Sequence, residues 1–73
     1  MEPNELEALV ELIQQQLMLA GVADVRNGML VRLPRYLDAE NMQVLARKLN
    51  RGRRMHYEVI HRPSERRVWV RMR

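Results

Sequence analysis

The chain contains no cysteine, and this absence in a sequence of 73 residues is the strongest constraint on its fold. A domain of this size buries only about 60% of the surface that the unfolded chain exposes, so small domains often depend on disulfides or metals. Without thiols, neither disulfides nor thiolate zinc sites can form. We therefore expect a single domain over residues 1–73, monomeric and held together by apolar packing, in a reducing cytoplasm.

The net charge of +4 conceals a separation of charge along the chain. Residues 1–25 carry five acids and no base, whereas residues 26–73 carry all thirteen bases against four acids. Twelve of the bases are arginine, which grips phosphates and carboxylates with a planar fork, although a GC-rich genome also favours arginine codons. This polarity predicts a domain with two different surfaces, one of which faces an anionic partner.

The first segment has the pattern of an amphipathic helix. Asn4 and Glu7 have the N-x-x-E spacing of a capping box, and Gly21 is placed to end the helix. Apolar residues at the helical period predict one buried stripe: Leu6, Leu9, Val10, Ile13 and Leu17. Three more apolar residues widen it and favour a helix buried on more than one side: Leu12, Met18 and Leu19.

Asn27-Gly28 separates two apolar-bearing runs, residues 22–26 and 29–33, and this is the strongest short-range signal for a hairpin. Asp38 is a plausible cap for a second helix that ends near Gly52. Residues 55–60 and 67–73 alternate between apolar and polar side chains around a turn at 62–65, which predicts a second hairpin.

The predicted fold is therefore α+β, with two helices packed on a small antiparallel sheet of two hairpins, in the order helix, hairpin, helix, hairpin. If the Asn27-Gly28 turn fails and residues 22–33 form one strand, the order becomes αβαββ.

No group of residues suggests catalysis, so we expect a protein that is not an enzyme and needs no cofactor. Ser64 is the only serine, it lies in a predicted turn, and no carboxylate is identified that would orient His61 as its base. His56 and His61 are five residues apart, which places them on opposite faces of a regular strand and argues against a shared metal. No apolar run approaches the roughly 20 residues that span a bilayer, and the start of the chain lacks a secretory pattern, so no membrane partner is expected.

The last predicted strand carries the clearest candidate for binding. Trp69 shares one face with Arg67, Arg71 and Arg73, opposite the apolar Val68 and Val70. Such a face suits a protein interface, in which Trp and Arg dominate the binding energy, or a nucleobase stacked on the indole. The ordinary alternative is a tryptophan that covers the sheet while the arginines reach into solvent.

Two charged groups complete the candidates. Arg53 and Arg54, near the end of the second helix, are expected to form a basic edge with Arg66 across the hairpin, and Arg73 extends the nucleic-acid candidates. Trp69, Arg67 and Arg71 are the candidates for contact with a protein partner. The acids Glu5, Glu7 and Glu11 offer a second docking surface, for a basic partner. The ordinary alternative is that these acids form a solvated helix face.

The whole chain resembles the small phage-encoded transcription regulators of the Xanthomonas phage type, which bind host RNA polymerase. The resemblance rests on the length, on the opening residues 1–7 (MEPNELE) and on the arginine-rich end at 66–73 (RRVWVRMR). It implies a partner in the N-terminal region of the polymerase β′ subunit near the RNA exit channel, with nascent RNA nearby, in the cytoplasm of the infected host. It also implies inhibition of initiation at σ-dependent promoters and antitermination, but it assigns no contact residues.

Two other functions stay open. One is a small basic domain that binds RNA or DNA without polymerase, for which the αβαββ order offers a fold-level analogy with ribosome-associated folds. The other is a phage-type inhibitor of a different host protein, such as a nuclease.

Overall fold

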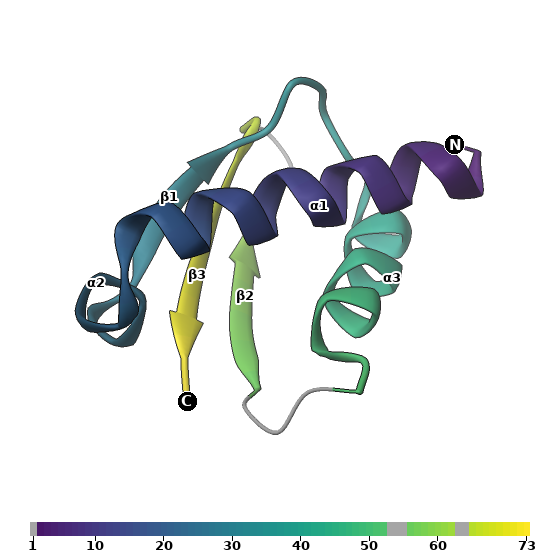
Figure 1. Ribbon diagram of the computed structural model, residues 1–73. Coiled ribbons are helices and arrows are strands. Elements are labelled where there is room, and N and C mark those ends of the chain that lie inside the picture. Colours follow the sequence, from purple (N-terminus) through teal and green to yellow (C-terminus); the bar gives the residue numbers. More distant parts are fainter. Residues whose placement is uncertain (1, 53–55, 63–64) are drawn as a thin grey trace.

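The computed structural model describes residues 2–52, 56–62 and 65–73, and these form an α+β domain (Figure 1). Its helices are α1 (Pro3–Ala20), α2 (Val22–Asn27) and α3 (Ala39–Asn50). Its strands are β1 (Met29–Arg32), β2 (Tyr57–His61) and β3 (Arg67–Met72), which form one antiparallel sheet. The predicted fold class is confirmed, but the order of elements is ααβαββ.

Strand β3 lies at the centre of the sheet, in the order β1-β3-β2. It pairs with β1 from Met29–Val70 to Arg32–Arg67, and with β2 from Tyr57–Met72 to His61–Val68. Since both outer strands are antiparallel to β3, β1 and β2 run in the same direction, and α3 connects them. The arrangement is a split βαβ unit with β3 inserted between its strands.

The first helix buries the stripe that its period predicts, because all five of the predicted core residues of α1 are buried. Its start differs from the capping-box prediction: Glu2 is the N-cap, no side chain caps the helix, and Pro3 occupies the first turn, where a missing N–H costs nothing. Gly21 ends the helix with φ of +89°, as predicted. The predicted widening of the stripe is wrong at Met18 and Leu19, which are 82% and 83% exposed.

The hairpin predicted at Asn27-Gly28 does not form, because residues 22–27 are helix α2. Gly28, at φ of +98°, ends this helix, and its N–H donates to the carbonyl oxygens of Asp24 (3.0 Å) and Val25 (3.2 Å). A glycine at positive φ serves a helix end as well as a tight turn, so the same dipeptide fits both. The short helix buries Val25, and β1 finds its partner in distant β3 instead. The alternative αβαββ order is closer, since it has one strand before α3, but that strand covers only Met29–Arg32.

Helix α3 begins as predicted, with the Asp38 Oδ1 accepting a hydrogen bond from the Asn41 N–H at 2.7 Å. Its last residue, Asn50, fastens the helix to the sheet. The Asn50 Oδ1 accepts from the Tyr57 N–H (2.6 Å), and its Nδ2 donates to the carbonyl oxygens of Tyr57 (3.1 Å) and Ala46 (3.1 Å). This side chain therefore joins the end of α3 to the first residue of β2.

The core lies between one face of the sheet and helices α1 and α3; in Figure 1, α1 crosses in front of the sheet and α3 lies beside β2. Val31, Val68 and Val70 supply its sheet side, and Ile13, Leu45 and the other helix residues supply its helix side. Leu33 and Leu37, in the segment from β1 to α3, are also buried. No helix in the described part of the chain covers the opposite face of the sheet, and the side chains on that face form the candidate site.

Candidate binding surfaces

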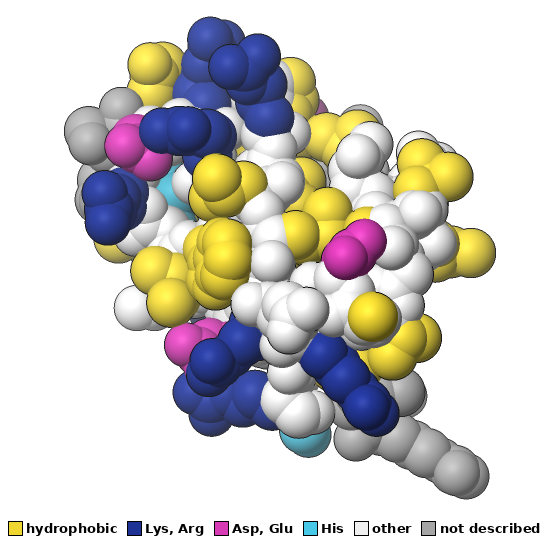
Figure 2. All heavy atoms as spheres, turned by 90° about the vertical axis from the view of Figure 1, so that its left-hand side faces the viewer, with side chains coloured by type: hydrophobic (Ala, Val, Ile, Leu, Met, Phe, Trp, Pro, Cys, Tyr) yellow, Lys and Arg dark blue, Asp and Glu magenta, His cyan; other side chains and the backbone are white. Residues whose placement is uncertain are grey.

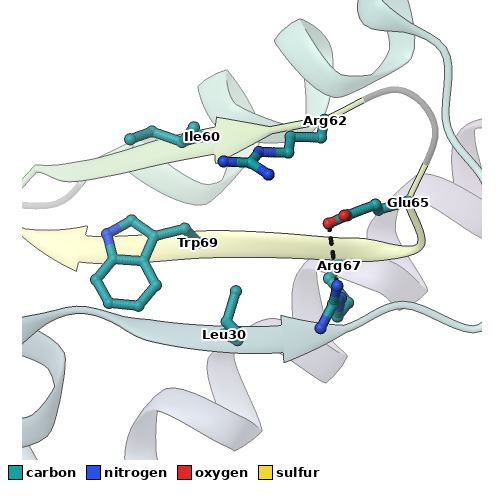
Figure 3. Close-up of a pocket in the computed structure, with 6 residues that line it drawn as sticks. All are labelled: Leu30, Ile60, Arg62, Glu65, Arg67 and Trp69. Carbon is teal, nitrogen blue, oxygen red and sulfur yellow. Dashed lines mark ion pairs between the residues drawn. The ribbon is translucent and has the colours of Figure 1, made fainter.

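An apolar row crosses the open face of the sheet. Leu30 on β1 and Ile60 on β2 both pair with Trp69 on β3, so the three side chains lie side by side across the strands. Leu30 and Ile60 are 55% and 49% exposed, whereas Trp69 is half-buried. Figure 3 shows the three residues around a hollow of about 350 Å³, which Arg62, Glu65 and Arg67 also line.

The indole of Trp69 packs closely against the backbone of Gly28. A Cβ atom added to Gly28 would overlap the ring at Cζ2 and Cε2 and would lie 2.9 Å from Nε1. Figure 3 shows the ring broadside, lying across the sheet from β3 toward β1. One side of the ring therefore packs on the backbone, and the other side is turned outward.

A second row, of arginines, lies beside the apolar row. Arg32 and Arg67 are paired directly across β1 and β3, and Arg62 follows the last residue of β2 on the same hollow. Arg67 forms an ion pair with Glu65 at 3.3 Å, drawn in Figure 3. No ion pair is found for Arg32 or Arg62 within the described residues.

On the other side of the apolar row, Glu58 binds two arginines. Its Oε2 accepts hydrogen bonds from Arg71 (3.1 Å) and Arg73 (3.0 Å). The hydrogen bond from Arg73, followed by that from Arg71, lowers the pKa of the Glu58 carboxyl below its usual value. This carboxylate neutralises part of the positive charge at the C-terminal end of β3.

The face predicted for Trp69 is confirmed, since Arg67 and Arg71 lie with it on the uncovered side of β3. Of the predicted basic edge, the structure describes Arg66, which directly precedes β3. Its guanidinium lies over the ring of Tyr36, 5.5 Å from the ring centroid. Two members of that edge, Arg53 and Arg54, lie outside the described residues.

The acids predicted to attract a basic partner are partly engaged within the fold. Glu5 pairs with Arg35 at 2.6 Å, and Glu7 lies 3.9 Å from Lys48 on α3. Glu11 is exposed beside the shallow hollow between α1 and α3. Two of the three acids thus have partners in the same chain, and they join α1 to the loop before α3 and to α3 itself.

An apolar patch that the sequence did not indicate lies where α1 meets α2. Its members are Met18 and Leu19, both almost fully exposed, and Val22, which is 57% exposed. Met18 and Val22 line a groove of about 320 Å³, together with Gln14, Leu17, Gly21, Val25, Tyr57 and Met72. Figure 2 looks onto this end of the molecule, where hydrophobic side chains reach the surface between groups of basic ones.

Four other residues of the open face were not predicted as binding residues: Leu30, Arg32, Ile60 and Arg62. The alternation of β2 and β3 carried the signal for Ile60, because it lies on the same side as Trp69 once the two strands are paired. Leu30 and Arg32 carried no such signal, since their own strand was expected to pair with residues 22–26.

The histidines lie apart from these surfaces. His56 is exposed, and the Nε2 of His61 is shielded from solvent without a hydrogen-bond partner in the described structure. Ser64 lies outside the described residues. In the described ranges, no three His, Asp or Glu side chains are close enough to hold a metal ion. Every helix there also lacks the combined length and apolar character needed to cross a membrane.

Comparisons with protein-family models, with curated proteins and with solved structures give no match to this chain. The protein is therefore described by its architecture. It is a small α+β domain whose three-stranded sheet is covered by helices on one face and is open on the other.

Proposed function

We propose that this chain is a non-enzymatic transcription regulator of the phage type, which binds host bacterial RNA polymerase. Its site would be the N-terminal region of β′ near the RNA exit channel, and its effects would be inhibition of σ-dependent initiation and antitermination, in the cytoplasm of the infected host. The identity of the partner comes from the resemblance in residues 1–7 and 66–73.

The observation that supports docking on a protein is the apolar patch of Met18, Leu19 and Val22. Burying a Leu or Met side chain is worth about 1.5–3 kcal/mol, yet two neighbouring ones are left in water here. Contiguous exposed apolar side chains mark interaction sites in soluble proteins. The groove beside the patch gives a partner side chain a place to enter.

The test is retention of purified host RNA polymerase on the tagged chain at low-micromolar concentration. Leu19→Gln with Met18→Gln should weaken retention at least tenfold, because both side chains lose their apolar contact with the partner. Tyr36→Gln is the control, since it removes an exposed apolar side chain from the loop between β1 and α3, away from the patch. No retention of polymerase by the parent chain, or equal retention by the patch variant, would refute the proposal.

The transcriptional effect needs its own assay. With a σ-dependent promoter and an intrinsic terminator on one template, the parent chain should lower the number of initiated transcripts and raise the fraction that passes the terminator. The patch variant should lose both effects in proportion to its loss of binding, and the Tyr36→Gln control should keep them.

A further inference from the structure

The open face of the sheet carries two adjacent rows whose chemistry fits one ligand. We infer that this face binds single-stranded nucleic acid, with a base stacked on Trp69 and the backbone phosphates held by Arg32, Arg62 and Arg67. The face lies away from the α1–α2 patch, so the inference holds whether or not polymerase is the protein partner.

The apolar row has the form of a site for one base. The indole is fixed against Gly28 with its other side turned outward, so it offers a flat ring that does not need to be ordered on binding. Leu30 and Ile60 flank it on neighbouring strands, which lie about 4.8 Å from the central strand. Stacking on an aromatic side chain is worth about 1–3 kcal/mol per base and accepts every base, because each base has a π-face.

The arginine row lies where the backbone of such a strand would run. Rows on one face of a strand are two residues, or about 7 Å, apart, so a base on Trp69 brings its phosphate near the three guanidinium groups. Arg32 and Arg67 lie directly opposite each other on β1 and β3. Like charges in this position repel and destabilise a sheet. Glu65 offsets this repulsion for Arg67 alone, whereas a polyanion along the row would offset it for all three.

The same geometry disfavours a duplex. The hollow of about 350 Å³ accepts a single base, and the bases of a duplex are stacked on each other and cannot reach the indole. An acidic protein segment would satisfy the arginines but would leave the outward side of the indole without a stacked partner.

The experiment uses the fact that Trp69 is the only tryptophan, so intrinsic fluorescence reports on this surface. A labelled 12-residue oligouridylate is titrated with the full chain at 50 mM salt, and anisotropy and quenching are measured together. We expect both signals to saturate together, with log K falling against log salt with a slope of about −2 for three phosphate contacts to a single strand. DNA of the matching sequence shows whether the 2′-hydroxyl contributes to the affinity. A duplex should bind more weakly than the single strand. A 12-residue polyglutamate should not quench the Trp69 fluorescence.

Matched variants locate the site. Arg32→Ala with Arg62→Ala should weaken binding about tenfold or more and reduce the salt slope by about 1.4, because two contacts are lost. Arg47→Ala with Arg51→Ala removes the same charge from exposed positions on and after α3, and should leave the affinity within about threefold. Trp69→Leu, checked by circular dichroism for folding, should weaken binding at least fivefold by anisotropy.

In the reverse titration, absence of Trp69 quenching up to a 100-fold molar excess of oligouridylate over protein would overturn the inference. Equal losses in the two double variants would also overturn it, as would a duplex or a polyglutamate that quenches as strongly as the single strand. Because polymerase is absent from this assay and retention is measured without nucleic acid, failure of one proposal leaves the other standing.

Discussion

Replacing Gly28 with alanine should destabilise the domain through two separate effects. The first is in the backbone: Gly28 has φ of +98° and ψ of 142°, a region that is nearly restricted to glycine and costs about 1–3 kcal/mol for other residues. The second is steric, because the new Cβ would overlap the indole of Trp69. Forcing an extra carbon into a packed site costs about 1–3 kcal/mol. The expected loss of unfolding free energy is therefore about 2–6 kcal/mol.

Gly21→Ala separates the two effects. Gly21 has φ of +89° and ψ of 164°, close to the values of Gly28, but a Cβ there meets no atom within 4 Å. This variant should lose only the backbone contribution of about 1–3 kcal/mol. The difference between the two alanine variants then measures the contact between Gly28 and the indole.

Urea unfolding followed by circular dichroism provides the measurement. A domain of this size has a slope near 1 kcal/mol per molar urea and a total stability of about 4–11 kcal/mol, so Gly28→Ala should lower the midpoint by about 2 M or more. In a Trp69→Leu background, Gly28→Ala should cost no more than Gly21→Ala does in the parent. If Gly28→Ala and Gly21→Ala have equal effects in the parent chain, the indole does not rest on Gly28, and the argument for a fixed stacking surface is refuted.

Three other predictions concern the core, the α3–β2 junction and the Glu58 cluster. Leu9→Ala should lower the free energy of unfolding by about 2–5 kcal/mol, because the side chain is buried. An unchanged urea midpoint would mean that the wrong face of α1 is assigned to the core. Asn50→Ala should cost about 2–4 kcal/mol because it removes three hydrogen bonds. Asn50→Asp should cost less, since Asp keeps the acceptor for the Tyr57 N–H, and equal losses in the two variants would show that this accepted bond contributes nothing. Glu58 has a lowered pKa in the fold, so its stabilising effect is present above the usual carboxyl pKa and is lost as the pH falls through the folded value. Glu58→Gln should therefore flatten the stability profile on the acid side of about pH 4.5, and an unchanged profile would contradict the assigned ion pairs.

The features that the sequence predicted are those set by neighbours along the chain. The stripe of α1, the Asp38 cap and the outward face of Trp69 follow from periods and capping chemistry within a few residues. The failure at Asn27-Gly28 has a local cause as well, because a glycine at positive φ ends a helix as readily as it makes a turn.

Other features depend on residues far apart, and no local pattern predicts them. The Glu5–Arg35 ion pair joins residues 30 positions apart, and the row of Leu30, Trp69 and Ile60 exists only when β3 lies between the other strands. The exposure of Met18 and Leu19 likewise reflects where α2 turns away from α1, since their apolar character alone favours burial.

The position of β3 has a consequence for the order in which the domain assembles. Strands β1 and β2 make no pairing with each other, and β3 is the last of the three along the chain. During synthesis, the helices can form as soon as they emerge, but every strand pairing waits for residues 67–72. The pairing of β3 with β2 then closes a short hairpin, whereas its pairing with β1 joins residues far apart along the chain, which is typical of slow folding. Until that step, neither the apolar row nor the arginine row exists, so a nascent chain that lacks β3 has no open-face surface with which to bind.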